Sequence, residues 1–236
     1  MKVYLAGSAE PALADHFRNI GCDVQRVSTS GIVAPPVSDH PDMFMCRMGV
    51  DYDSVIVKHP QLSLSLAGPD ACSDPDRMIS SGNSHFLEYP YDIAYNAACT
   101  GKYFVHNLRY TAPELIETAR KLGITLLDVR QGYTKCSTVV VDENSIITYD
   151  HGIGKVCMQA GMDVLIVLPG HVLLPGYNTG FIGGVSGRVG DTVYFNGDLS
   201  MHPDHAKITE FIEMRGLRVI YFPDWPLTDI GTIYCE

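Results

Sequence analysis

The same order of hydrophobic and polar positions recurs four times along the chain. In each copy an amphipathic segment ends at a glycine, and a short run of mainly aliphatic residues begins directly after it, at Cys22, Ile124, Met162 and Leu217. A glycine commonly follows the last turn of a helix, and aliphatic runs bounded by turn residues favour strands. The pattern therefore predicts four helix–strand pairs, with helices over residues 11–19, 113–122, 152–160 and 203–215.

Hairpins are predicted between these pairs. Turn residues at 99–102, 142–145 and 187–191 supply the Gly, Asn or Asp that tight connections need. The strand that enters each hairpin is predicted to begin at a polar residue: Asp42, Asp92, Lys135, Thr179 and Asp229. No second strand follows the last of these strands, and the residue pattern of residues 1–8 matches that of the missing partner strand. We therefore expect residues 3–6 to pair with residues 230–234.

Together these elements make five copies of one strand–strand–helix–strand unit. A unit of roughly 45 residues cannot bury its apolar face alone, so the copies must pack around a common centre. The sequence predicts a single α/β domain over residues 1–236, a closed propeller with approximate five-fold pseudosymmetry in which the last strand pairs with the N-terminal strand. Residues 60–91 lack the helical pattern, and an irregular connection is expected there.

Composition narrows the class of partner. The chain is 46% hydrophobic and carries a formal net charge of −10, which leaves no basic surplus for nucleic acid or for anionic membrane surfaces. No apolar run reaches the roughly 18 residues of a membrane span, and the first residues lack a signal-peptide core, so a cytoplasmic protein is expected. The seven cysteines form no CxxC pair, which favours free thiols over disulfides or a zinc site.

The five polar strand-opening residues are the candidate binding site. Because they hold equivalent positions in the repeat, Asp42, Asp92, Lys135, Thr179 and Asp229 should ring one end of a central channel. Clustered carboxylates accept the donors of a guanidinium or ammonium group; alternatively, each Asp binds the local backbone of a turn. Lys135 either neutralises these carboxylates, anchors a ligand carboxylate, or acts as base or nucleophile.

A ring of five such units, completed by the two chain ends, resembles the pentein fold of guanidino-group modifying enzymes, which include arginine deiminases, dimethylarginine dimethylaminohydrolases and amidinotransferases. The resemblance covers nearly the whole chain and rests on architecture and periodicity. It implies a hydrolase or transferase acting on C–N bonds of a guanidino or amino compound, with a cysteine nucleophile, a histidine and acidic residues that hold the guanidinium. The alternative is a non-catalytic scaffold of the same fold that binds a small molecule or a protein.

Several residues are candidates for the catalytic groups that this resemblance implies. Cys235 lies in the last unit, as the nucleophile of the family does, but about 20 Å along the strand from the channel mouth. Cys46 faces the channel at greater depth, and His171 or His40 would supply a base from a loop near the rim. Strand alternation turns Cys136 away from the channel, so it is expected to be buried and inert.

The remaining expectations concern partners and the glycine-rich stretch at residues 180–187. The expected partners are a cationic small molecule and a second copy of the chain in a homodimer, without nucleic acid or a membrane. Neither a cofactor nor a metal ion is expected. The glycine-rich stretch enters a hairpin rather than a helix, so it is interpreted as the lining of a narrow channel and not as a phosphate-binding loop.

Overall fold

The computed structural model describes residues 1–28, 30–51, 54–62, 64–65 and 86–236, and this part of the chain is mixed α/β with four α-helices and five small sheets. All four predicted helices are confirmed, with ends within two residues of those expected. Their bounds are α1 Pro11–Asn19, α2 Pro113–Lys121, α3 His151–Gln159 and α4 His205–Glu213. Most of the connection expected at residues 60–91 lies outside the described residues.

Three of the sheets share one strand order. In each, a short first strand pairs antiparallel with a second through a tight turn, and the chain then passes through a helix into a third strand, parallel to the second. The predicted hairpins are therefore confirmed. The three sets are β6 Ala98–Cys99, β7 Tyr103–His106 and β8 Thr125–Asp128; β9 Thr138–Val140, β10 Ser145–Thr148 and β11 Asp163–Ile166; and β12 Ser186–Val189, β13 Thr192–Phe195 and β14 Arg218–Tyr221.

The fourth sheet joins the two ends of the chain. Its order is β15-β1-β2-β5, from strands β15 (Tyr234–Cys235), β1 (Lys2–Ala6), β2 (Asp23–Val27) and β5 (Leu64–Ser65). Strand β1 is antiparallel to β15, with Tyr4 opposite Tyr234, and parallel to β2, which follows α1. The predicted pairing of the chain ends is confirmed, although residues 230–233 form no strand. The fifth sheet pairs β3 (Met45–Arg47) with β4 (Ile56–Lys58).

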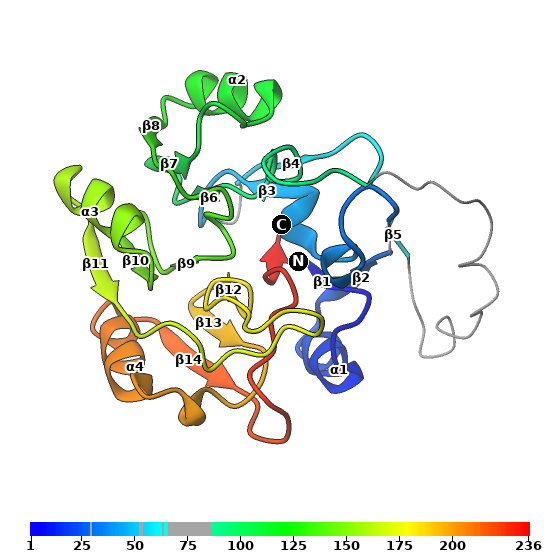
Figure 1. Ribbon diagram of the computed structural model, residues 1–236. Helices are drawn as coiled ribbons and strands as arrows, with labels where there is room; N and C mark the ends of the chain where they lie inside the picture. The colour runs from blue at the N-terminus through cyan, green and yellow to red at the C-terminus, as the bar shows by residue number, and fades with distance from the viewer. Residues whose placement is uncertain (29, 52–53, 63, 66–85) are drawn as a thin grey trace.

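The first strands of the sheets lie next to one another in chain order. Strand β3 contacts β6, β6 contacts β9, β9 contacts β12, and β12 contacts β15. Tyr234 of β15 packs in one apolar cluster with Met45 of β3. In Figure 1 the sheets surround the middle of the view, where both chain ends lie. We call β3, β6, β9, β12 and β15 the inner strands.

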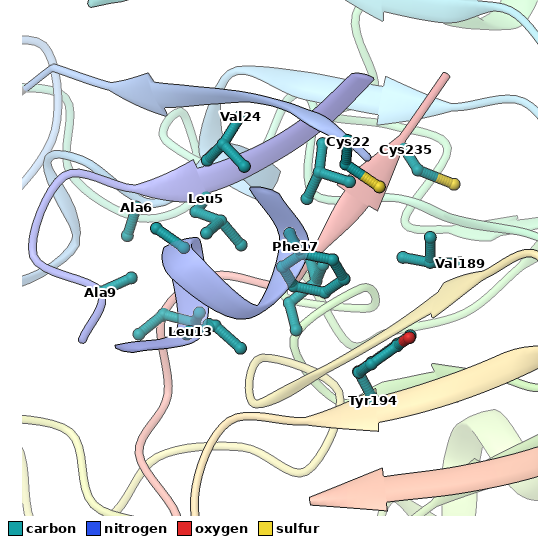
Figure 2. Packing of buried hydrophobic residues seen from close by; sticks show 14 residues of the cluster. Leu5, Ala6, Ala9, Leu13, Phe17, Cys22, Val24, Val189, Tyr194 and Cys235 are labelled. Atoms are coloured by element: carbon teal, nitrogen blue, oxygen red, sulfur yellow. The ribbon is translucent and has the colours of Figure 1, made fainter. Parts of the chain in front are cut away.

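Each helix covers a separate apolar cluster. Under α1, for example, Leu13 and Phe17 pack against Leu5 and Val24 of the parallel strands, and the neighbouring sheet contributes Tyr194 (Figure 2). The other three helices bury equivalent clusters between their own sheet and the next. Burial of such a side chain stabilises the folded state by about 1.5–3 kcal/mol, so these contacts fix the spacing of the sheets.

The inner strands begin later than the sequence pattern predicted. Residues 41–43 form a single 3-10 turn, and residues 92–95, 134–137 and 182–185 form turns, so the strands begin at Met45, Ala98, Thr138 and Ser186. The polar residues expected at strand starts lie instead in or near these turns. Side chains do not alternate between two faces in a turn as they do along a strand, and the directions inferred from alternation therefore fail there.

Candidate functional site

Six polar side chains meet where the turns enter the inner strands. They come from four separate parts of the chain, and all six are buried. We call them the buried polar cluster: His40, Asp42, Asn96, Lys135, Cys136 and Asp229. Buried polar groups are normally stabilised by hydrogen bonds, so the partners of each group define what the cluster can do.

The thiol of Cys136 lies at the centre of the cluster. Its Sγ donates to Oδ2 of Asp42 at 3.0 Å and accepts from Nδ2 of Asn96 at 3.1 Å. The amide oxygen of Asn96 accepts from the backbone N–H groups of Lys135 and Cys136, at 3.0 and 3.2 Å, which holds the turn against the neighbouring unit. The prediction that Cys136 points away from the centre is wrong, because Cys136 lies in a turn and not in a strand.

The second carboxylate, Asp229, is held by backbone donors. Its Oδ2 accepts from the N–H of Phe181 at 2.9 Å and its Oδ1 from the N–H of Gly231 at 3.0 Å. Nδ1 of His40 lies 3.8 Å from the same Oδ1. The backbone of Gly184 approaches so closely that a Cβ there would lie 2.0 Å from Oδ1 of Asp229. Glycine is therefore required at this contact.

Lys135 points from the cluster toward the inner strands. Its Nζ donates to the carbonyl oxygens of Gly183 at 3.2 Å and Thr138 at 3.4 Å, and lies 6.0 Å from the ring centre of Tyr234. The positive charge of Lys135 also interacts with Asp42 and Asp229. Nζ forms no direct ion pair with a carboxylate of the described residues, so the role of Lys135 in balancing the carboxylates stays a prediction.

Burial dominates the protonation of the cluster. It raises the pKa of Asp42 and of Asp229, and it lowers the pKa of Lys135, because each charged form loses its contact with water. Burial also raises the pKa of the Cys136 thiol well above its usual range, and the negative charges of Asp42 and Asp229 raise it further. Oδ1 of Asp42 has no hydrogen-bond partner in the described part of the chain. The described residues thus supply no hydrogen-bond donor to this oxygen of Asp42.

Three stacked and half-buried aromatic rings lie beside the cluster. Phe181, whose N–H binds Asp229, stacks on Tyr149 with ring centres 5.8 Å apart and on Tyr133 with ring centres 6.2 Å apart. The Tyr133 hydroxyl donates to Oδ2 of Asp92 at 2.6 Å, and all three rings are half-buried. Burial raises the pKa of Asp92. We call Tyr133, Tyr149 and Phe181 the aromatic stack. The sequence pattern had assigned no role to the two tyrosines.

The structure brings together three of the five predicted ring residues. Asp42, Lys135 and Asp229 belong to the buried polar cluster, and Asp92 lies beside it, joined through Tyr133. Thr179 is exposed, and its hydroxyl donates to the nearby carbonyl oxygens of residues 172 and 180. The hydroxyl of Thr179 therefore stabilises its own loop, and Thr179 is not part of the buried polar cluster.

Three of the predicted catalytic residues lie apart from the cluster. Cys235 is packed under α1 beside Cys22, and its thiol donates to the carbonyl of Arg188 (Figure 2). Cys46 donates to the carbonyl of Ala97, and burial raises its pKa well above the usual range. His171 is exposed and its ring lies against His202. The strands that carry Cys235 and Cys46 direct these side chains toward a neighbouring sheet, and the loop that carries His171 directs its ring toward solvent. The order of residues along the chain does not reveal these directions.

His40 is the imidazole that the structure places in the cluster. It precedes the turn at residues 41–43, and the close approach of Gly231 to its Cβ fixes its position. The side chain of Asn96, for which the sequence pattern predicts no role, binds the backbone of Lys135 and Cys136. Both are polar residues next to a turn that leads into an inner strand, and that position is the signal that could have identified them.

Within the described residues, no group of three His, Cys, Asp or Glu side chains is arranged to hold a metal ion. In the same part of the chain, none of the helices has the length and apolar character needed to cross a bilayer.

The model of DUF6873, a family of unknown function, matches residues 5–234. The chain belongs to this family. The match includes every residue of the buried polar cluster and of the aromatic stack, so the site lies within the family's common region. No curated protein and no solved structure matches the chain.

Proposed function

We propose that this DUF6873 protein binds the cationic group of a guanidino or amino compound at the buried polar cluster and acts on one of its C–N bonds. In this proposal the five sheets are the units of a closed propeller, as in the pentein enzymes that the sequence resembles. The contacts of the inner strands in chain order and the pairing of β1 with β15 support that architecture. The six cysteines of the described residues are free thiols, which supports a cytoplasmic location.

The observation that carries the proposal is the hydrogen bond from the Cys136 thiol to the Asp42 carboxylate, with a second carboxylate, Asp229, in the same cluster. Carboxylates next to a thiol provide both a site for a cation and a base for the nucleophile. The aromatic stack adds ring faces at the entrance, and aromatic faces attract cations. A ligand would enter past Phe181, whose ring is half-buried while the carboxylates behind it are buried.

The chemistry follows from these positions. Asp42 takes the proton of the Cys136 thiol, and the sulfur attacks the guanidinium carbon, so that a C–S bond forms. The C–N bond then breaks, and the amine leaves with the proton that Asp42 accepted. Water attacks the same carbon and gives one proton to Asp42, the C–S bond breaks, and the sulfur takes the second proton of the water as a urea-type product forms. Asp42 then releases its proton to the solvent. The raised pKa of Asp42 suits it to hold a proton between these steps.

Ligand binding would also activate the nucleophile. The carboxylates of Asp42 and Asp229 raise the pKa of Cys136 in the ligand-free protein. A bound cation neutralises their field, and an opposite charge within a few ångströms favours the thiolate. The amide of Asn96 would then donate to the thiolate sulfur, which it already contacts. The thiol is therefore expected to react only when a cation occupies the cluster.

A matched pair of reagents tests this proposal. Chloroacetamidine carries an amidinium cation and an electrophilic carbon, while chloroacetamide has nearly the same shape and no charge. Chloroacetamidine should modify Cys136 at least about tenfold faster, with saturation, because one extra ion contact of about 1.4 kcal/mol gives that ratio. Arginine or agmatine should protect the thiol, and peptide mass spectrometry identifies the modified residue.

Two variants control this experiment. Asp229→Asn should remove the preference for the charged reagent, whereas Cys235→Ser should keep both the preference and the site of modification, because Cys235 lies under α1. Equal rates with the two reagents at Cys136 would refute the proposal.

The second candidate function is a non-catalytic scaffold that binds a cationic ligand. It is favoured by the raised pKa of Cys136 and by the absence of a hydrogen-bond partner at Nδ1 of His40 in the described part of the chain. Guanidines that raise the melting temperature without any reagent preference at Cys136 would select this function.

A further inference from the structure

A narrow cavity lies between the inner strands, next to Lys135. Its volume is ≈ 30 Å³, and each of the five inner strands, or the residue before it, contributes to its wall. The cationic side chains of Arg47, Lys135 and Arg188 line it, together with Tyr234, and its lining contains no acidic residue. The cavity is thus positively charged, although the whole chain is acidic.

The two guanidinium groups make hydrogen bonds only to carbonyl oxygens. Arg47 donates through Nη2 to the carbonyls of Val50 and Asp51, at 3.1 and 2.8 Å, and through Nη1 to that of Arg188 at 3.3 Å. Arg188 donates through Nη1 to Val141 and through Nε to Gly190. Neither forms an ion pair with any carboxylate of the described residues. Buried charges are normally paired, yet Arg47, which is buried, and Arg188, which is half-buried, form no ion pair within that part of the chain.

Two of the side chains that line this cavity carry a donor without a partner in the described residues. Nε of Arg47 belongs to a side chain that is more than nine-tenths buried, and its N–H makes no hydrogen bond. The hydroxyl of Tyr234 is equally buried and equally without a partner. Groups in this state are rare in folded proteins and call for an acceptor.

We propose that this cavity binds a small oxyanion, of the size of a nitrate ion or a single carboxylate group, between Arg47, Arg188 and Lys135. The anion accepts from the free Nε–H of Arg47 and from the Tyr234 hydroxyl, and its single negative charge offsets part of the positive charge of the two guanidinium groups. A cavity of this volume holds only a few non-hydrogen atoms, so nucleotides and sugar phosphates are excluded. The inference does not depend on the reaction proposed for the buried polar cluster.

Anion titrations of the full chain test the inference. Sodium nitrate, sodium acetate and sodium benzoate are each titrated by calorimetry and by thermal unfolding, with the bulky sulfonate HEPES holding the ionic strength constant. Nitrate and acetate should bind saturably and raise the melting temperature, because a ligand that prefers the folded state stabilises it. Benzoate, whose ring is too large for the cavity, should give no saturable signal.

Three variants locate the site. Arg188→Gln should weaken nitrate binding at least about tenfold, the value of one lost ion contact of about 1.4 kcal/mol, while Arg109→Gln, at an exposed position, should bind like the wild type. Tyr234→Phe removes a hydroxyl without a partner, so it should fold normally and still bind nitrate several-fold more weakly. The inference is overturned if neither small anion binds saturably, if benzoate binds as well as acetate, or if Tyr234→Phe binds nitrate like the wild type.

Discussion

Replacing Gly184 by alanine gives the most direct test of the packing at the site. The new Cβ would lie 2.0 Å from Oδ1 and 2.4 Å from Cγ of Asp229, so the carboxylate must move. Moving it weakens the hydrogen bonds from Phe181 and Gly231, which are worth about 1.5–3 kcal/mol each when the acceptor is charged. Overpacking adds about 1–3 kcal/mol, and partial relaxation offsets some of the sum, so we expect a loss of about 3–6 kcal/mol.

Urea unfolding of Gly184→Ala and of Gly31→Ala measures this loss against a matched control. Gly31 is exposed and has no atom within 4 Å of the position of a Cβ, so its replacement should change the free energy of unfolding by less than about 1 kcal/mol. A double-mutant cycle with Asp229→Ala isolates the clash, because the cost of Gly184→Ala should fall once the carboxylate is gone. If Gly184→Ala costs no more than Gly31→Ala, or costs the same with and without Asp229, the described contact is wrong.

Three further predictions concern the site. The pKa of Asp42 and of Asp229 is raised in the folded state, so the folded protein binds more protons than the unfolded chain. These two groups therefore make the free energy of unfolding fall as the pH rises from about 4 through their raised pKa. Asp229→Asn should flatten this slope in urea titrations at a series of pH values. In Asn96→Ala the buried N–H of Cys136 loses its acceptor, while the N–H of Lys135 keeps the backbone carbonyl of residue 96, so the change should cost about 1–3 kcal/mol in urea unfolding; a cost below about 0.5 kcal/mol would show that the turn does not need this amide. Tyr133→Phe deletes the hydrogen bond to Asp92 and should lower the free energy of unfolding by about 1.5–3 kcal/mol; an unchanged urea midpoint would contradict that bond.

The helices and hairpins could be predicted because local chemistry determines them. Pro11 and Pro113 open helices whose last turns are followed by Gly21 and Gly123, both with positive φ, and these signals need no tertiary information. The pairing of β1 with β15 was also predictable, since only one strand and one partner were left over at the two ends of the chain. The repeated pattern of hydrophobic and polar residues therefore predicted the sheets and the connections between them.

The directions of the site side chains could not be predicted in the same way. A turn at residues 134–137 precedes β9, so Lys135 and Cys136 do not alternate as strand residues would, and Cys136 reaches Asp42 in another unit. The bond of Tyr133 to Asp92 joins residues 41 positions apart, and no local signal marks it. The sequence indicated which turns meet, but the contacts between turns depend on how the sheets are set against one another.

The pairing of β1 with β15 also has a consequence for the order of folding. Val3 and Cys235 are separated by nearly the whole chain, whereas β9 and β10 are joined by a short turn. Closing the long loop costs roughly 3 kcal/mol more in chain entropy than closing the short one. Contacts between distant residues form slowly for this reason. Refolding should therefore pass through a stage in which the three hairpin sheets are ordered while the edge of β1 is still open, and that edge would then be the part of the molecule most exposed to pairing with another chain.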